Sequence, residues 1–546
     1  EALASYARSE AAFRRLGLDD ATAEPRANRG IELLALGRAR QALTALSSAE
    51  RSFAAAGDRL WAAKCAGYSA QAHAQLGQLG DALRVLRPAW ETLTSLGAGA
   101  EAARLQLDMA AVYLAAGLAG EAYEEAAAVG QQMARADMTH DQAAAAFTMA
   151  LAAAATGNLE EAGIALQSAA NLFIRVGDRQ YQARTLLAQA DLAADLGREA
   201  HARALVREAI QQLGRGGWLV PLTWALLREA DLALDTAEQD SALAEAGRLV
   251  DELGRPPQLR SGVLVRLAQR HRAQGQAGKA VELLREAVGL DQRVGGTLPD
   301  WVLRASFRAA QLGPSDELVD LLLDIGGTAE VAEAGLVCEQ AKAQTLQDLI
   351  AGTVGSPGRR RGGSPEDQLA RRRADLSAAY AALTVAESPA RRTLVQGRAA
   401  ELERQLGRLQ IATAGGTGAD AQPAASLSRL GPTVAYHVGG DDLDIFVVDE
   451  GKVRVRRLPG AVPAVTFQLD RLAAQWNRFR VGSVFARRNS AALAATTQTV
   501  LQDLHRMLLE PVADLVPSSG PLAVVPHRQL HQVPFHALHD GHQHLV

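Results

Sequence analysis

Glycine recurs at a fixed 40-residue interval between positions 17 and 217, and this repeat constrains the fold more than any other feature of the chain. A glycine can take positive φ without strain, so each of these positions is expected to end a helix of three to four turns and to reverse the chain. One helix pair cannot bury its own apolar face, and the sequence therefore predicts a solenoid of stacked helix pairs. The first series is Gly37, Gly77, Gly117, Gly157 and Gly197; the second, offset by 20 residues, is Gly17, Gly57, Gly97, Asp137, Gly177 and Gly217.

Small residues keep the same register inside the predicted helices. A neighbouring helix must approach closely at these positions, so enlarging Ala82 or Ala162 to leucine should overpack the contact and cost about 1–3 kcal/mol. The pattern slips after Gly217 and returns at Gly275. The small residues are Ala42, Ala82, Ala122, Ala162 and Ala202 in one series, and Gly30, Ala70, Ala110, Ala150 and Ala190 in the other.

Segments such as QAHAQLGQLGDALRVL (71–86) and MALAAAATGNLEEAGIAL (149–166) resemble the tetratricopeptide repeat family in the order of their small residues and glycine turn. The period of 40, in place of the family's usual ~34, implies longer helices. The resemblance covers residues 1–345 and implies a superhelix whose concave face binds a peptide or another protein. The alternative is a purely architectural spacer. Ala2 stands one period before Ala42, so we expect the chain to begin within the second helix of a repeat, without a capping unit ahead of it.

Composition excludes several classes of function. The net charge is −4, from 57 basic and 61 acidic residues, so no overall field attracts nucleic acid or a membrane surface. The longest uncharged apolar stretch, residues 143–155, is shorter than the ~18 residues that a membrane span needs. The two cysteines, Cys65 and Cys338, cannot form a disulfide framework and favour a reducing, cytoplasmic setting. Each is expected to be a small buried apolar residue.

Residues 346–425 are expected to connect two domains. Cys338–Ile350 reads as a last helix, 352–368 as a flexible loop, 369–411 as helix in a short coiled coil, and the following Gly- and Ala-rich stretch as a second linker. The basic clusters 359–361 and 371–373 have no aromatic residues among them and have acidic neighbours. We interpret them as solvated surface, not as a nucleic-acid contact.

Alternation with a period of two begins at Pro432. The stretches TVAYHV, DLDIFVVDE and GKVRVRRL predict a hairpin and a third strand, with a turn around Gly440 and Asp441. A helical region is expected over about 463–515, interrupted near 481–488, and a short buried strand over Leu522–Val525. Strands that alternate with helices favour an α/β sheet.

Three stretches in this region resemble the CHAT domain family of caspase- and separase-like domains. They are VAYHVGGDDLDIFVVDEGKVRVRRLP, LHRMLLEPVADLVP and LAVVPHRQLHQVPFHALHDG, the last of which matches the family's strand–Pro–turn–Leu-x-x-x-Pro-Phe-x-Ala-Leu pattern. The resemblance covers residues 430–546 and implies the leading part of such a domain. We therefore expect the chain to be truncated at both ends, with an unpaired sheet edge and incomplete folding beyond about residue 430.

The resemblance implies a His–Cys dyad on later strands, and neither of its motifs occurs in this sequence. No catalytic residue, cofactor ligand or metal ligand is therefore predicted. The histidines crowded near the C-terminus fit no zinc spacing and are interpreted as turn and loop residues. They are His527, His531, His536, His539, His542 and His544.

Three hypotheses remain. The first is a repeat-regulated cysteine peptidase of the CHAT type, in which the chain shown is inactive alone. The second is a non-catalytic scaffold with a degenerate CHAT-like domain. The third is a repeat-containing regulator for which the C-terminal likeness misleads.

Overall fold

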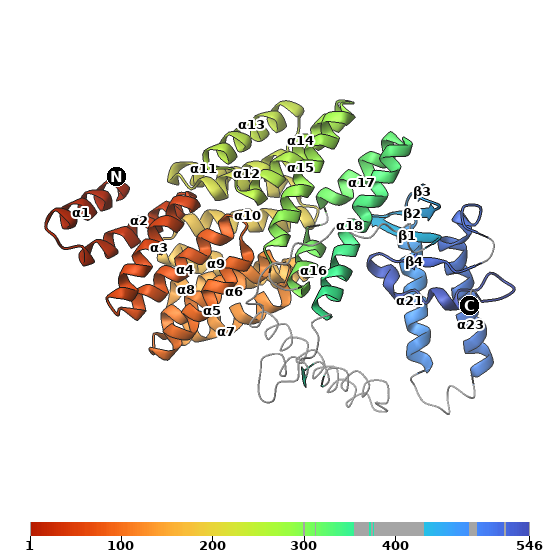
Figure 1. The fold of residues 1–546 in the computed structure, drawn as a ribbon, viewed down its shortest axis with the longest axis horizontal. Helices are drawn as coiled ribbons and strands as arrows, with labels where there is room; N and C mark the ends of the chain where they lie inside the picture. The colour runs from red at the N-terminus through yellow and green to blue at the C-terminus, as the bar shows by residue number, and fades with distance from the viewer. Residues whose placement is uncertain are drawn as a thin grey trace. The chain divides into compact units, whose positions relative to one another are not determined.

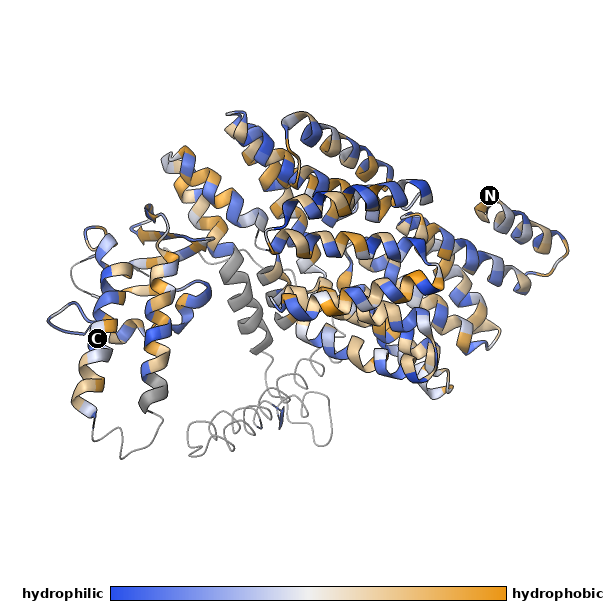
Figure 2. Cartoon of the chain, turned by 180° about the vertical axis from the view of Figure 1, so that it is seen from behind, coloured by the Kyte–Doolittle hydropathy of each residue, from blue (hydrophilic) through white to orange (hydrophobic). Residues whose placement is uncertain are grey.

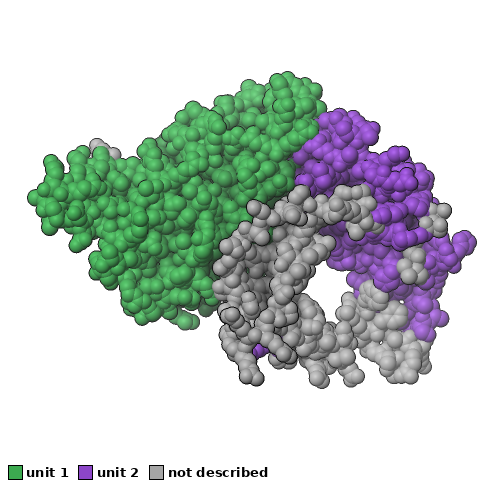
Figure 3. All heavy atoms as spheres, viewed as in Figure 1, with its two compact units in different colours: residues 1–314, 407–418 green, residues 315–406, 419–546 purple. Residues whose placement is uncertain are grey.

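The structure, a computed structural model, describes residues 2–298, 301–311, 313–353, 371–372, 375, 431–479, 489–517 and 520–544. Its contacts divide the chain into two compact units, shown in separate colours in Figure 3. We call residues 1–314 with 407–418 the array unit, and residues 315–406 with 419–546 the sheet unit. The predicted domain limits at 345, 425 and 430 stay predictions. The contacts group residues 315–345 with the sheet.

The array unit is a solenoid of helix pairs, as the glycine repeat predicts (Figure 1). Each repeat contributes a first and a second helix, and first helices of most neighbouring repeats touch one another. The first helices are α2 (Ala23–Ala35), α4 (Arg59–Gln75), α6 (Gly99–Ala115), α8 (Thr139–Ala155), α10 (Arg179–Asp195), α12 (Leu219–Asp231) and α14 (Pro257–Ala273). The second helices are α3 (Ala39–Ala55), α5 (Leu79–Ser95), α7 (Ala119–Arg135), α9 (Leu159–Val176), α11 (Glu199–Gly216), α13 (Thr236–Glu252) and α15 (Ala277–Gly296).

Helix α1 (Ala2–Arg15) takes the position of a second helix, as expected, and is joined to α2 through a 3-10 turn (Asp20–Thr22). Helix α16 (Trp301–Ala310) follows α15. Hydrophilic and hydrophobic residues are interleaved along the helices of the array, as amphipathic packing requires (Figure 2). Among the described residues, no helix combines the length and apolar character needed to cross a bilayer.

Every glycine of both series has positive φ, and Asp137, which replaces one of them, has φ of 56°. The register slip after Gly217 has a local cause. Helix α12 stops at Asp231, and Asp235 caps α13 by accepting hydrogen bonds from the amides of Ala237 and Glu238. Because α12 has 13 residues where α10 has 17, the turn comes early and the positions that follow leave the 40-residue register.

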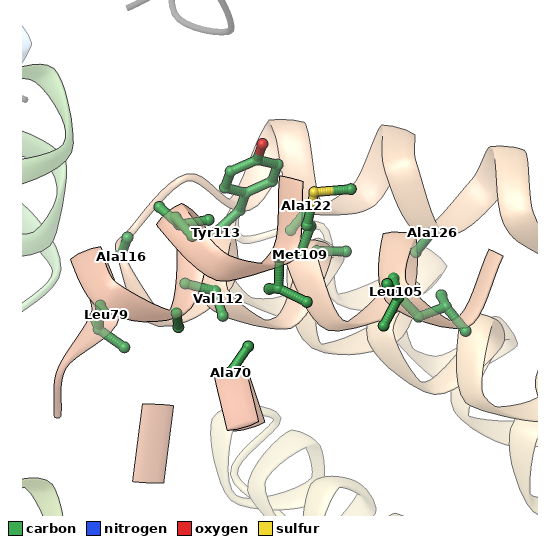
Figure 4. Close-up of a cluster of buried hydrophobic side chains, with 14 of the residues drawn as sticks. Ala70, Leu79, Leu105, Met109, Val112, Tyr113, Ala116, Ala122 and Ala126 are labelled. Carbon is green, nitrogen blue, oxygen red and sulfur yellow. The ribbon is translucent and has the colours of Figure 1, made fainter. Parts of the chain in front are cut away.

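The small residues of the repeat are buried in the core of the array, as predicted. All nine alanines of the two series are at most 1% exposed. A Cβ on Gly30 would lie 2.6 Å from a carbon of Leu46 on the paired helix, so this glycine allows the close approach. Figure 4 shows the cluster formed by α4 to α7, where Ala70, Ala116 and Ala122 pack among larger side chains such as Leu79 and Tyr113.

The superhelix returns on itself within the array unit. Buried residues of α15 and α16, among them Val294 and Phe307, belong to the same apolar cluster as α4 to α7. The turn at Gly77 packs against α15: a Cβ on Gly77 would be 2.9 Å from a side-chain carbon of Val294. At Gly117 a Cβ would collide with the carbonyl oxygen of Ser306. These glycines are therefore required twice, for their backbone conformation and for the contact.

The sheet unit contains a four-stranded mixed sheet in the order β3-β2-β1-β4. Strands β1 (Thr433–Gly439), β2 (Asp442–Asp449) and β3 (Lys452–Leu458) form an antiparallel meander, which confirms the predicted hairpin and third strand. Strand β4 (Ala523–Val525) pairs in parallel with β1. The prediction of a buried fourth strand was wrong in one respect: all three residues of β4 are half-buried, because it lies at an edge of the described sheet.

Both faces of the sheet are covered. Helices α21 (Val462–Phe479) and α23 (Ser490–Leu508) pack on the face that presents Tyr436 and Ile445. Helix α18 (Thr328–Thr353) packs on β3 from the other face, and α17 (Gly313–Ile325) contacts the same face through its aspartates. The helical prediction for Cys338–Ile350 is confirmed within α18. Short 3-10 turns complete the unit at Glu510–Val512, Arg528–Gln532 and Phe535–Ala537.

The predicted connector loop and linker lie almost entirely outside the described residues, as do the basic cluster 359–361 and nearly all of the predicted helix 369–411. In the second cluster, Arg372 lies 3.6 Å from Asp375.

Candidate binding groove

Helices α4, α6, α8 and α10 line a cavity of about 650 Å³ in the array unit. A neighbouring cavity of about 680 Å³ shares Gln71, Asp108 and Arg184 with it and extends to Trp224 on α12. We call this joined surface the inner groove. Since it is built on first helices of consecutive repeats, the repeat itself brings residues about 40 positions apart onto one surface.

Polar side chains join neighbouring first helices at a constant spacing of 37 residues. This spacing is one repeat less about one helical turn, so it connects equivalent faces of adjacent helices. A search for complementary residues at this offset could have found the pairs, which the sequence analysis missed. They are Gln71 with Asp108, Arg104 with Asp141, and Asp191 with Arg228.

The centre of the groove wall holds an ion-pair network between α6, α8 and the start of α10. Arg104 donates to both carboxylate oxygens of Asp141, at 2.9 and 3.0 Å. His140 lies 2.9 Å from Asp178, the N-cap of α10. Burial would raise the pKa of Asp141, but hydrogen bonds from His140 and Arg104 outweigh it and lower the pKa to about 2. Hydrogen bonds to Asp141 and Asp178 raise the pKa of His140 to about 9. The wall is therefore charged but locally neutralised at pH 7.

Asp108 is the exception among the acids of the groove. Burial raises the pKa of its carboxyl to about 7, and the hydrogen bonds from Gln71 only partly offset this effect. The Gln71 amide lies 2.9 and 3.0 Å from the two oxygens. Near pH 7 the carboxyl is thus present in both protonation states, and it can accept or donate a hydrogen bond to a bound group.

Arg184 gives the groove a positively charged group on an aromatic wall. Its guanidinium carbon lies 4.4 Å from the ring centre of Tyr181 and 5.2 Å from that of Phe147. Within the described part of the chain, no carboxylate lies within ion-pair distance of Arg184. Stacking fixes the orientation of the planar guanidinium while its N–H groups stay available to a ligand.

Neither cysteine is among the residues that line the inner groove. Cys65 on α4 is 1% exposed and packs against Ala27 and Ala49. Burial, with a smaller contribution from Glu50, raises the pKa of its thiol to about 12, so it is protonated at neutral pH. Cys338 on α18 is 3% exposed in the sheet unit. The two are not joined by a disulfide.

The C-terminal histidines separate into different surroundings. His527 stacks on His437 of β1 with ring centres 5.3 Å apart, and its Nδ1 accepts a hydrogen bond from the Val438 amide at 2.9 Å. His539 lies near Gln498 of α23 and meets His544 edge to face. Among the described residues, no three side chains of metal-binding type converge on one point.

Residues 498–546 match the CHAT domain family. The matched segment comprises most of α23, strand β4 and the turns that follow it. No curated protein matches the sequence at a significant level.

Solved structures similar to this chain include two helical repeat proteins. A Rap protein crystallised with competence and sporulation factor matches with 13% identity and a TM-score of 0.41, over 50% of this chain and 76% of that one. Yeast Tom70 matches with 13% identity and a TM-score of 0.28, over 71% of this chain and 96% of that one. The chain is an array of stacked helix pairs. At its C-terminal end it carries a CHAT-type segment.

Proposed function

We propose that the array unit binds an extended peptide segment of a protein partner in the inner groove, on the concave side of the superhelix. The observation that carries this proposal is Arg184, a cation stacked on two aromatic rings inside a groove of several hundred Å³. Peptide recognition needs apolar contact area together with a few polar groups of fixed orientation, and the groove offers both.

A protein partner suits the groove better than a nucleic acid does. Its bases alternate with acids, as in the pairing of Arg104 with Asp141 and of His140 with Asp178, so the wall presents no continuous positive surface to a phosphate backbone. We further propose a cytoplasmic setting, which suits two buried cysteines in separate units.

A charge reversal on one helix tests this proposal. The purified chain is used to select from a phage-displayed library of random peptides, in parallel with Arg184→Glu and Arg179→Glu. Arg179 is an exposed residue on the same helix and does not line the groove, so it controls for the change in net charge. Peptides enriched on the wild type and on Arg179→Glu, but not on Arg184→Glu, would support the proposal. Equal enrichment on all three, or none on the wild type, would refute it.

For the intact protein we propose a cysteine peptidase of CHAT type whose access or assembly the array controls. The match of residues 498–546 favours this candidate. The alternative is a non-catalytic scaffold with a degenerate CHAT-like domain. In either case Cys65 and Cys338 are not nucleophiles, because a nucleophile needs an accessible thiolate. Iodoacetamide should label neither cysteine in the native chain and both in urea. Rapid native labelling of either one would contradict this assignment.

A further inference from the structure

Helix α17 presents a row of aspartates to the sheet. Asp316, Asp320 and Asp324 follow one another at intervals of four residues, so they share one face of the helix. All three contact basic side chains of the sheet unit: Asp316 approaches His437 and Arg528, and the other two approach Arg457. The contacts join residues more than 100 positions apart in the sequence.

The strand register creates the complementary row on the sheet. His437 of β1, Asp444 of β2 and Arg457 of β3 are direct cross-strand neighbours. Asp444 is fully buried, 3.4 Å from His437 Nδ1 and 3.1 Å from Arg457 Nε. Basic, acidic and basic side chains therefore alternate across three strands beneath the acidic face of α17.

The same contact reaches the turn after β4. Arg528 donates to Asp316 at 2.7 Å, and its backbone has φ of 50°, a conformation that non-glycine residues rarely take. The preceding residue, His527, stacks on His437. This turn belongs to the segment that matches the CHAT domain family, so α17 contacts the family-specific part of the sheet unit directly.

We propose that α17 is an electrostatic latch: Asp316 holds His437 and Arg528 together, so that displacement of α17 frees the turn that follows β4. Helix α17 begins at Gly313, at the boundary between the two units. Helix α17 is therefore the first element of the sheet unit along the chain after the array. In this proposal α17 has a second, open position, which would make it an element of the kind through which a distant site can act on a domain.

The latch depends on the charge of His437. Burial lowers the pKa of this imidazole, but hydrogen bonds to Asp316 and Asp444 outweigh burial and raise the pKa above its ordinary value. The other charged groups around it are Arg457 on β3, Asp320 on α17 and Arg528, while His527 accepts a hydrogen bond at Nδ1 and is neutral. The cationic form donates to both aspartates, and the neutral form can donate to only one. The latch is therefore closed at low pH and weakens as the pH rises through the raised pKa.

Hydrogen exchange of the full chain tests the latch. Peptides covering β4 and the following turn are compared in the wild type, in Asp316→Asn and in Asp514→Asn. Asp514 forms an exposed pair with Arg456 in the same unit and is the matched control. We expect roughly tenfold faster exchange of the turn in Asp316→Asn only, because a charged partner of buried groups is lost. Equal exchange in the two variants would overturn the proposal.

A second measurement keeps the proposal testable if Asp316→Asn fails to fold. In the wild type, exchange of the turn, corrected for its intrinsic pH dependence, should accelerate as the His437 imidazole titrates. An NMR titration should place that pKa above the ordinary ~6.5. A pKa at or below this value, or protection of the turn that does not follow it, would refute the latch.

Discussion

Different kinds of contact stabilise the array unit and the sheet unit. In the array, alanines in repeated positions bring helices close together, and the polar pairs of the groove join neighbouring repeats. In the sheet unit, residues of the strands such as Tyr436 and Phe446 are buried, and the polar contacts join distant parts of the chain, as between Asp316 and His437. A mutation in the array should therefore destabilise mainly the repeat that carries it. The stability of the sheet unit should instead depend on a few long-range contacts.

The largest effect is expected at Asp444. The variant Asp444→Ala leaves His437 and Arg457 without their shared buried carboxylate. Removal of one partner from a buried ion network costs about 3–5 kcal/mol. Hydrogen exchange in urea should show this loss in peptides of β1 to β3 and no change in peptides of α5.

The control for this variant is Asp514→Ala, at an exposed pair that should contribute about 0–1 kcal/mol. If Asp444→Ala also loosens α5, the two units unfold together and the contrast between them fails.

The second largest effect is expected from a comparison of two glycine turns in the array, of which only one also makes a long-range contact. Gly117 and Gly157 have nearly the same φ, 81° and 78°, but only a Cβ on Gly117 meets another part of the chain, at Ser306. Gly157→Ala should cost about 1 kcal/mol for its positive φ. Gly117→Ala should cost about 2–4 kcal/mol, because helix α16, which carries Ser306, must also shift. Hydrogen exchange in urea gives both values, from peptides of α6 and α7 for Gly117→Ala and from peptides of α8 and α9 for Gly157→Ala. Equal costs would mean that the return of the superhelix contributes little stability.

The sequence predicted the array closely because its rules are local. A glycine or an alanine at a fixed offset reports a turn or a close helix contact within one repeat, and every such position behaves as expected. The return of α16 onto Gly117 was not predictable, since it depends on a small rotation added up over the five helix pairs from α6–α7 to α14–α15. The contact of α17 with the sheet was missed for a related reason: its aspartates become informative only once the strand register is known.

The third prediction concerns two aspartates of the groove, whose contributions to the free energy of unfolding should depend on pH with opposite sign. The pKa of Asp108 is raised to about 7, above its unfolded value of ~3.9, so its protonated form is favoured in the folded state. Its contribution is full below pH ~4 and is lost as the pH rises through 7. Asp108→Asn should therefore stabilise the array by about 2 kcal/mol at pH 8, after a discount for partial exposure, and hardly at all at pH 4.

The variant Asp141→Asn should change stability in the opposite direction to Asp108→Asn. The lowered pKa of Asp141, about 2, means that its carboxylate stabilises the fold above pH ~4, and that this contribution disappears as the pH falls through 2. The variant should thus be destabilised at pH 8. Urea denaturation at the two pH values, followed by circular dichroism, distinguishes the pair, and shifts of the same sign would contradict the assigned environments.

The groove shows where reading the sequence reaches its limit. The resemblance to tetratricopeptide repeats predicts a binding surface on the concave face of the superhelix, but it does not predict the chemistry of that surface. Arg184, Phe147 and Tyr181 come from two helices and meet only after packing. The polar pairs could have been found from their 37-residue offset, because that signal is periodic.

The smallest effect is expected at Asp137, the one position of the two turn series where the sequence has no glycine. Asp137 stands in the glycine series with φ of 56°, a conformation that costs a residue with a Cβ about 1 kcal/mol. Asp137→Gly should remove this strain, and the greater flexibility of glycine in the unfolded chain offsets part of the gain. We therefore expect a stabilisation of about 0.5 kcal/mol, visible as slower exchange of peptides from α7 and α8. The control is Asp195→Gly, in the last turn of α10, where glycine should destabilise by about 0.3 kcal/mol. If Asp137→Gly also destabilises, the aspartate contributes more at this turn than its backbone conformation costs, and the repeat rule that predicted the array is incomplete at that position.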